Sequence, residues 1–362
     1  MSSADWADRA LAAVMARVTA TEAEVGTRFP LYADPRNGSW TTTGRGAWAG
    51  GFWAGLLWLR ARYTGRYADR RAAAGCTARL EGWTGADTAT RGLIFWYGTA
   101  LAEGVPAETA LRDRAARACL ADFDPERGIV PWGGAFGGPR MLARVDGVPG
   151  TVPLLACAGP AGTAAAAAHL DRHLGLCLGG AGEQRPPAWR LDDEDGTWSP
   201  CADPRTGWSR GRAWLLLAIA DALLRPDVVA HGRVHPAEAA ERLLAQDDVL
   251  TGRLIPPAEG TDPDGPSDTS AAAITAVALL KLARVPGAGW TDACAYRGVA
   301  TLSRLAQAHL SRTQDGLPAG MLLDGCYDAG KGLAVRHELV WGDFFLALGL
   351  ASLDGLVDIT RV

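Results

Sequence analysis

The sequence WTTTGRGAWAGGFWAGLLWL, residues 40–59, decides the fold, because a polar, Gly-rich segment with two tryptophans leads directly into a mostly apolar helix. Variations of this design return in the segments that begin at residues 89, 150, 207, 267 and 340. The chain therefore holds about six copies, irregularly spaced but near the period expected of arrays of helical hairpins.

A more amphipathic helical stretch precedes each apolar helix. Between residues 5 and 25, for example, Trp6, Leu11 and Val14 recur at helical spacing among charged residues. The other stretches of this kind span residues 67–83, 106–123, 161–178, 236–247 and 290–310.

The alternation of the two helix types predicts two concentric rings. A helix that is apolar on most faces must be covered by protein on most sides. A helix that is apolar on one face only can lie at the surface, with its polar face in water. No run alternates apolar and polar residues convincingly over the length of a strand. We therefore expect an all-α protein, an (α/α)6 barrel with little or no sheet, in which residues 1–362 form a single catalytic domain.

Composition excludes several classes of protein. The formal net charge of -4 and the pI near 5.9 give no basic surface for nucleic acid. The seven cysteines are scattered without C-x-x-C pairs, which indicates reduced thiols. The polar N-terminal residues do not resemble a signal peptide, and no segment is long and apolar enough to span a bilayer. We expect a cytoplasmic monomer or homodimer with no nucleic-acid or membrane partner.

Long connectors rich in Gly, Pro and Asp should crowd one mouth of this barrel. They span residues 122–146, 179–207, 248–266 and 313–337, and all lead into inner helices. Loops carry polar groups, and helix N-termini present unsatisfied N–H groups and positive dipole ends. An anionic or hydroxyl-rich small molecule, such as an oligosaccharide, would suit this mouth. The 14 tryptophans favour a sugar, whose rings stack on indole, although tryptophan can also simply fill gaps between helices.

Two positions could carry chemistry or binding. Asp146 stands before an inner helix among apolar residues, where desolvation would favour the protonated acid, although an Asp before Gly can equally be a turn residue. Arg210 and Trp214 are four residues apart, so both can project from one helical face and hold a carboxylate. A structural ion pair is the alternative for Arg210.

Other polar residues have more ordinary explanations. Asp87 and Thr90 precede the second inner helix, and residues 268–270 precede the fifth. For both sets, capping of the helix N-terminus is a more ordinary explanation than a direct role in chemistry. His169 and His173 share a helical face but lack a third metal ligand or an H-E-x-x-H context. We therefore predict no catalytic metal and no cofactor.

Several motifs resemble the unsaturated glucuronyl and unsaturated rhamnogalacturonyl hydrolases, glycoside hydrolase families 88 and 105. The resemblance covers nearly the whole chain in the right order, and the WSRGRAW element of residues 208–214 is its most specific part. The other matching segments are residues 51–59 with 63–65, 145–146 with 153–155, 268–272, and 325–327 with 341–343.

The resemblance implies roles for particular residues. Asp146 falls on the family's general acid/base, and Trp208, Arg210 and Trp214 fall on its substrate-binding residues. The family's sugar is an enol ether, which one carboxyl group can hydrate by protonating C4 and then deprotonating the water that attacks C5. This route differs from that of ordinary glycosidases, which use a pair of carboxylates.

The chain also departs from the family pattern. Ala89 and Thr90 replace a His-Asp pair, which leaves Asp87, three positions before Thr90, as the candidate for a displaced second catalytic acid. We expect Thr90 to contact substrate, together with Trp48 and Trp341 from the first and last apolar segments.

Three hypotheses follow from these features. The first is hydration of a 4,5-unsaturated uronide or related enol ether, with Asp146 as the single acid/base. The second keeps the barrel and the acid but assigns a sugar-like or enol-ether intermediate of a specialised biosynthetic pathway. The third is a non-catalytic carbohydrate-binding relic.

Overall fold

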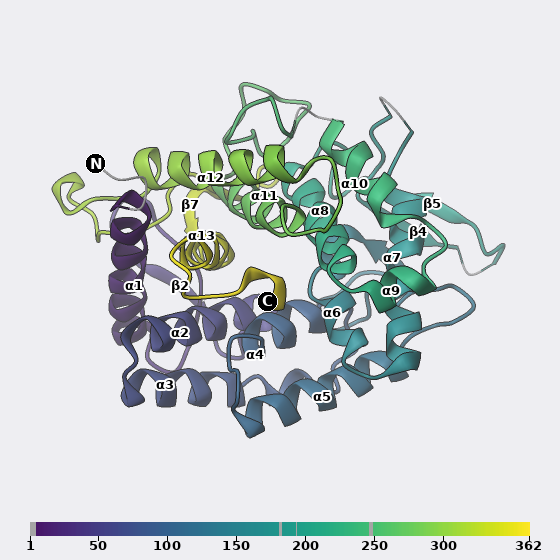
Figure 1. The fold of residues 1–362 in the computed structure, drawn as a ribbon, viewed down its shortest axis with the longest axis horizontal. Helices are drawn as coiled ribbons and strands as arrows, with labels where there is room; N and C mark the ends of the chain where they lie inside the picture. Colours follow the sequence, from purple (N-terminus) through teal and green to yellow (C-terminus); the bar gives the residue numbers. More distant parts are fainter. Residues whose placement is uncertain (1–4, 181–182, 193, 246–248) are drawn as a thin grey trace.

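Helices form two concentric rings in the computed structural model, which describes residues 5–180, 183–192, 194–245 and 249–362 (Figure 1). The inner ring holds α2 (Gly50–Thr64), a π-helical turn (Gly92–Trp96) with α4 (Tyr97–Thr99), α6 (Thr151–Ala156), α8 (Ser209–Leu223), α11 (Thr269–Leu282) and α13 (Val340–Leu353). The outer ring holds α1 (Asp5–Val25), α3 (Tyr67–Ala78), α5 (Pro106–Ala121), α7 (Pro160–Cys177), α9 (Pro226–His231), α10 (Pro236–Ala245) and α12 (Thr291–Ala308). Residues 246 and 247 of the expected helix 236–247, and residues 181, 182, 193 and 248 of the expected connectors, lie outside the described residues.

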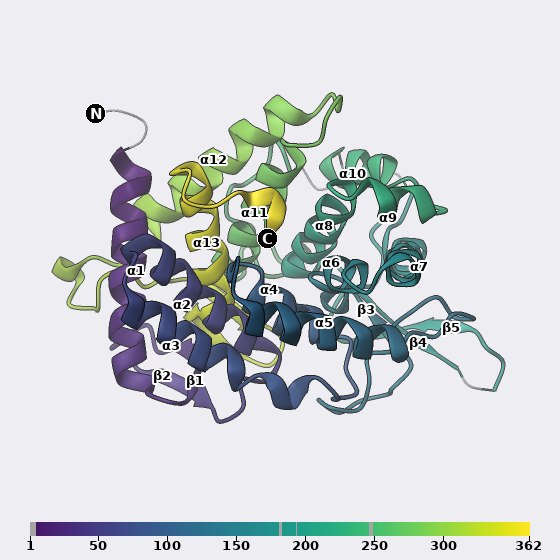
Figure 2. The same cartoon turned by 60° about the horizontal axis from the view of Figure 1, so that its bottom comes forward.

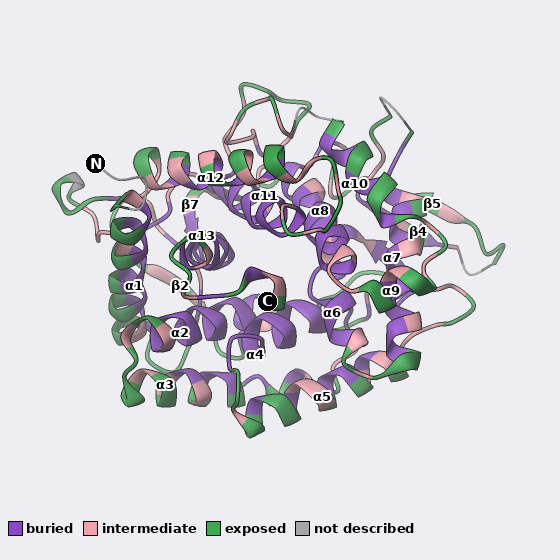
Figure 3. Ribbon diagram, in the orientation of Figure 1, coloured by how far each residue is buried: buried purple, intermediate pink, exposed green. Residues whose placement is uncertain are grey.

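Burial separates the two rings as the sequence pattern predicts. Every residue of α11 except Thr275 is buried, whereas the buried residues of α12 form a stripe that includes Cys294, Thr301 and Leu305. Figure 3 shows the same contrast between inner and outer helices around the ring. The helical alternation is thus confirmed, and it arises because only the inner helices are covered on most sides.

Two glycines of the segment 40–59 let α2 approach its neighbours closely. A Cβ on Gly51 would lie 2.1 Å from the carbonyl oxygen of Leu93, and one on Gly55 would lie 2.4 Å from Cε2 of Phe344. Neither position could hold a larger residue without moving α2 away from the π-helical turn or from α13. The GFWAG sequence therefore sets the spacing of the inner ring.

Aromatic side chains fill the barrel axis. Phe52 stacks on Tyr97 with ring centroids 5.3 Å apart and on Trp214 at 6.2 Å, and it packs against Phe345 at 5.6 Å. These side chains come from four different inner helices. They close the axis below the mouth and give the site a rigid apolar floor.

The expectation of little or no sheet is only roughly right, because short strands form two small antiparallel sheets. A four-stranded sheet has the order β2-β1-β7-β6, from β1 (Phe29–Ala33), β2 (Trp40–Thr43), β6 (Gly325–Asp328) and β7 (Leu333–Leu339). A three-stranded sheet has the order β3-β4-β5, from β3 (Leu142–Arg144), β4 (Ala188–Leu191) and β5 (Trp198–Pro200).

These strands lie at the ends of the inner helices where the chain enters them, along the lower side of Figure 2. Their pairing joins distant segments, since Tyr32 pairs with Leu339 in the first sheet and Ala143 with Trp189 in the second. Short strands with distant partners leave little local alternation in the sequence, which explains why the sequence did not reveal them. In the described part of the chain, no helix is both long and apolar enough to cross a membrane.

Candidate functional site

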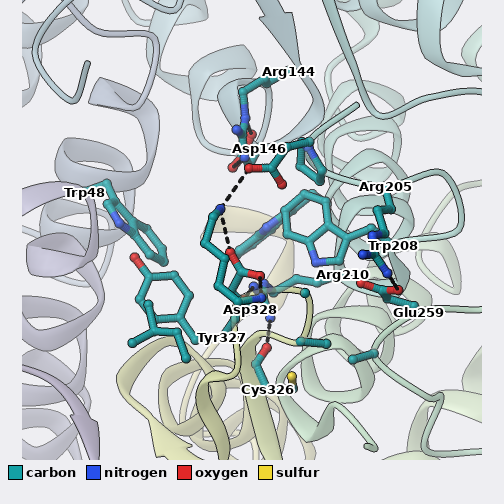
Figure 4. Close-up of a pocket in the computed structure, with 18 of the residues that line it drawn as sticks. Trp48, Arg144, Asp146, Arg205, Trp208, Arg210, Glu259, Cys326, Tyr327 and Asp328 are labelled. Carbon is teal, nitrogen blue, oxygen red and sulfur yellow. Dashed lines mark hydrogen bonds and ion pairs between the residues drawn. The ribbon is translucent and has the colours of Figure 1, made fainter. Parts of the chain in front are cut away.

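A cavity of about 640 Å³ opens where the connectors enter the inner helices (Figure 4). Aromatic side chains line it: Trp48, Trp132, Phe136, Trp208, Trp214 and Tyr327. Charged side chains also line it: Arg144, Arg205, Arg210 and Lys331, with Asp146, Asp203, Glu259 and Asp328. Flat apolar faces beside fixed charges suit a ring-shaped ligand that carries polar or anionic groups.

Asp146 lies in the cavity wall, on a 3-10 turn (Val145–Gly147) that connects β3 to α6. Arg144 donates two parallel hydrogen bonds to its carboxylate, from Nε to Oδ1 at 3.0 Å and from Nη2 to Oδ2 at 3.1 Å. The Asp146 side chain is 17% exposed. Its surroundings are therefore more polar than the apolar setting expected from the sequence.

The ion pair also fixes Arg144. Burial alone would lower the pKa of Arg144, but the adjacent Asp146 carboxylate outweighs it and raises that pKa above its ordinary value. The guanidinium carbon lies 4.8 Å from the ring centroid of Trp132, in a cation–π arrangement. Asp146, Arg144 and Trp132 thus form one ordered wall of the cavity.

Two buried histidines of α7 support this wall from behind. The Val130 N–H donates to Nδ1 of His169 at 3.0 Å, so the ring proton must be on Nε2, which donates to the Gly147 carbonyl oxygen at 3.3 Å. His173 Nδ1 donates to the His169 carbonyl oxygen at 2.8 Å. Burial lowers the pKa of both imidazoles, that of His173 to about 4, so both are neutral at pH 7. Neutral His169 therefore links Gly147, the residue after Asp146, to Val130 earlier in the chain.

Arg210 holds three elements together beneath the cavity. Its Nη1 donates to Asp268 Oδ2 at 2.6 Å and to the Cys326 carbonyl oxygen at 2.5 Å, and its Nη2 donates to the Tyr327 carbonyl oxygen at 2.6 Å. The guanidinium carbon lies 5.0 Å from the Trp208 ring centroid. The ion pair matches the structural alternative for Arg210, yet the side chain also lines the cavity.

Asp268 is the N-cap of α11, as the sequence suggested. Its Oδ1 accepts hydrogen bonds from the Ser270 N–H at 3.0 Å and the Ser270 hydroxyl at 2.6 Å, while Oδ2 faces Arg210. The carboxylate is fully buried and uses both oxygens within the protein. It positions Arg210 without touching the cavity.

Not every tryptophan predicted to bind substrate reaches the cavity. Trp48, Trp208 and Trp214 line it, whereas Trp341 is fully buried and does not. The ring centroid of Trp341 lies 4.8 Å from that of Trp48 and 5.2 Å from that of Tyr327. Trp341 therefore supports the aromatic wall from below.

Thr90 lines the cavity, but Asp87 does not. Asp87 Oδ2 instead accepts hydrogen bonds from the Gly134 N–H at 2.9 Å and from Arg140 Nε at 3.2 Å. Thr88, not Asp87, accepts the N–H of Thr90, at 3.1 Å, and the two threonine hydroxyls lie 2.9 Å apart. The structure brings Asp146 and Thr90 into one cavity and turns Asp87 toward a neighbouring loop.

Sequence reasoning missed several cavity residues. Arg144 could have been found, because it is a cation only two residues before Asp146 and could reach that carboxylate. Asp328 and Lys331 could not, because Lys331 Nζ bridges Asp328 and the distant Asp203, at 2.8 Å each. Burial would raise the pKa of Asp328, but the hydrogen bonds from Lys331 outweigh it and lower that pKa. This bridge links two connectors over the cavity.

Comparisons with known proteins agree with this architecture. No family model matches the sequence. The unsaturated glucuronyl hydrolase of Bacillus sp. (strain GL1) is 26% identical over 358 residues, which cover 91% of this chain and 92% of that relative.

Solved structures of the same name share the fold at low identity. An unsaturated glucuronyl hydrolase specific for heparin superposes with a TM-score of 0.83 at 18% identity, covering 98% of this chain and 99% of that one. The enzyme from Streptococcus agalactiae gives a TM-score of 0.83 at 15% identity, with 99% and 94% covered. The predicted resemblance is thus confirmed: over nearly its whole length the chain is similar to unsaturated glucuronyl hydrolases, and it shares their fold.

Proposed function

We propose that this enzyme hydrates a 4,5-unsaturated uronide or related enol ether, with Asp146 as the single general acid and base. The observation that carries the proposal is the position of Asp146, which is aimed into a cavity walled by aromatic rings and cations. Support comes from relatives whose structures hold sugars, such as the Streptococcus agalactiae enzyme variant complexed with dGlcA-GalNAc6S. Because the walls come from residues 48 to 333, the proposal treats residues 1–362 as one catalytic domain.

The reaction begins when protonated Asp146 gives its proton to C4 of the double bond. Positive charge then develops at C5 and the ring oxygen, and the carboxylate left behind is stabilised by two hydrogen bonds from Arg144. The same carboxylate takes a proton from the water that attacks C5. The resulting hemiketal opens and releases the aglycone, so no second carboxylate is required.

Arg210 is the proposed contact for the substrate's carboxylate. A guanidinium has five N–H groups, and three of those on Arg210 are used by Asp268, Cys326 and Tyr327. The remaining N–H groups leave donor capacity on a side chain that lines the cavity. The indole of Trp214, one helical turn further along α8, would lie beneath the sugar ring.

A second candidate function rests on Thr90. A hydroxyl paired with Thr88 occupies the place where the resembled family has its second acid, and Asp87 does not replace it. This difference favours an altered substrate, such as a sugar-like or enol-ether intermediate of a specialised biosynthetic pathway. The non-catalytic alternative is disfavoured because a binding relic would need neither Asp146 nor its ordered pairing with Arg144.

The test is an activity assay with unsaturated disaccharides that follows the loss of ultraviolet absorbance from the conjugated double bond. Asp146→Asn should lower turnover about 10² to 10⁴-fold while ligand binding persists, because an amide keeps the shape but delivers no proton. Asp87→Asn is the matched control and should leave turnover nearly unchanged. Equal rates for wild type and Asp146→Asn would remove Asp146 from the mechanism.

A further inference from the structure

A second cavity, of about 390 Å³, lies at the end of the barrel opposite the mouth. Its lining comes from the far ends of inner helices, including Trp96 and Ala100 beside α4, Cys157 after α6 and Arg225 after α8. It shares no lining residue with the cavity that holds Asp146. The proposed hydration reaction does not use it.

The cavity carries an excess of positive charge. The guanidinium carbons of Arg112 and Arg225 lie 5.9 Å and 5.2 Å from the ring centroid of Trp96. Glu103 is the acid in the lining, and it already pairs with Arg361 at 2.7 Å and with Arg62 at 3.1 Å. Across residues 5–180, 183–192, 194–245 and 249–362, no carboxylate forms an ion pair with Arg112 or Arg225.

Two buried donors beside these cations also lack a partner. Trp96 is 6% exposed, and neither its Nε1 nor the Nε of Arg112 donates a hydrogen bond in the described structure. A buried donor without an acceptor costs roughly 1 to 3 kcal/mol, and more when it is charged. An acceptor that reached both groups would remove this cost.

The negative ends of helices explain the position of Arg225 but not that of Arg112. The last carbonyls of a helix attract cations, and Arg225 Nη1 accordingly donates to the Asp221 carbonyl oxygen at 2.7 Å, at the end of α8. Arg112 belongs to the outer helix α5, and among the described residues it donates no hydrogen bond to the end of a helix. Its charge and the unused Trp96 N–H still require an acceptor.

We propose that this cavity binds a small oxyanion between Arg112, Arg225 and the Trp96 N–H. Planar guanidinium groups bind the oxygens of phosphate, sulfate or carboxylate through parallel hydrogen bonds. Phosphate, sulfate and carboxylate share a negative charge and several acceptor oxygens. The ligand is therefore either a free inorganic ion or an organic acid. The site is independent of the hydration reaction and would exist in an inactive variant.

Cys157 provides a local probe, because this residue is exposed and lines the cavity while most other cysteines are buried. The full-length protein would be labelled with a neutral thiol reagent at constant ionic strength, and labelling read at each cysteine by mass spectrometry. Inorganic phosphate, sulfate and citrate, each exchanged for chloride, should slow labelling of Cys157 saturably.

Charge-removing variants locate the effect. Arg112→Gln and Arg225→Gln should each weaken protection by about tenfold or more, as expected for loss of a charge-assisted hydrogen bond. Arg114→Gln, on the same helix but in an exposed pair with Glu81, should leave protection unchanged. Protection by citrate alone would assign the site to organic acids, and protection by all three anions would assign it to free oxyanions.

Two outcomes would overturn the proposal. One is a Cys157 labelling rate that does not respond to any of the three anions across the millimolar range. The other is protection that persists equally in both cavity variants, since binding elsewhere would then be its cause. Circular dichroism of each variant would show that the fold is retained before labelling is compared.

Discussion

Arg210 Nη1 lies 2.6 Å from Asp268 Oδ2, and this buried ion pair joins α8 to the start of α11. The same guanidinium holds the carbonyl oxygens of Cys326 and Tyr327 in β6. One side chain therefore fixes three separate elements around the cavity.

Removing this guanidinium should cost substantial stability. Arg210→Met leaves Asp268 buried without its cation, so we expect a loss of about 3–5 kcal/mol in the free energy of unfolding. Arg210→Lys keeps the charge but loses the planar fork, so it should cost less stability and still weaken binding of a carboxylate ligand markedly. Urea unfolding and ligand titration measure the two effects. Unchanged affinity in Arg210→Lys would leave Arg210 a purely structural role.

Removing Arg144 should slow turnover. Arg144 donates two hydrogen bonds to Asp146, and the adjacent carboxylate raises the pKa of Arg144. In the proposed reaction these bonds stabilise the carboxylate that remains after proton transfer. In Arg144→Met they are lost, so kcat should fall about tenfold or more, as expected for loss of hydrogen bonds to a charged group. An unchanged kcat would contradict this role for Arg144.

The buried imidazole of His173 should destabilise the protein in mild acid. An unfolded histidine titrates near pH 6.5, whereas burial lowers the pKa of His173 to about 4. The unfolded chain therefore binds the extra proton first, and stability is lost as the pH falls from about 6.5 toward 4, by about 3 kcal/mol for this group. Unfolding titrations of His173→Gln should show a weaker pH dependence in that window. Parallel curves for the two proteins would show that His173 titrates normally.

An acid introduced at position 90 tests whether the site has been adapted to a different substrate. Thr90→Asp should raise activity on unsaturated glucuronides or move its pH optimum upward, because it restores an acid where the resembled family has its second one. Thr90→Asn is the matched uncharged control and should give neither effect. Rapid hydrolysis by wild type at neutral pH, with Asp87→Asn harmless, would show that no such adaptation has occurred.

Position 89 is best left unchanged in this test. A Cβ on Gly147 would lie 3.1 Å from Ala89 Cβ, so the Ala89 side chain faces the backbone of Gly147 at close range. The histidine found here in the resembled family would press on the turn that carries Asp146. Thr90→Asp alone is therefore the cleaner substitution.

The ring architecture could be predicted because it depends on burial, which leaves a local pattern in the sequence. Residues 50–61 of α2 are all buried, whereas only a stripe of α12 is, and this difference in burial explains why the two helices differ in composition. The strands could not be predicted, since Tyr32 pairs with Leu339 near the other end of the chain and such a pairing leaves no local pattern.

The candidate site was predictable to a similar degree. Asp146 could be identified by its place before an inner helix and by family resemblance. The partners of Asp87 could not, because Gly134 and Arg140 lie 47 and 53 residues away in a connector without periodic pattern. Long-range hydrogen bonds of this kind follow from the folded geometry alone.

The bridge from Asp203 through Lys331 to Asp328 consists of exposed or partly exposed side chains, and it joins two connectors that belong to different hairpins. Because only side chains near the surface form this bridge, its charges can change without disturbing the buried packing of the helices. Substitutions at these three positions can therefore alter which ligands the cavity admits, while the inner helices and the turn that carries Asp146 stay in place.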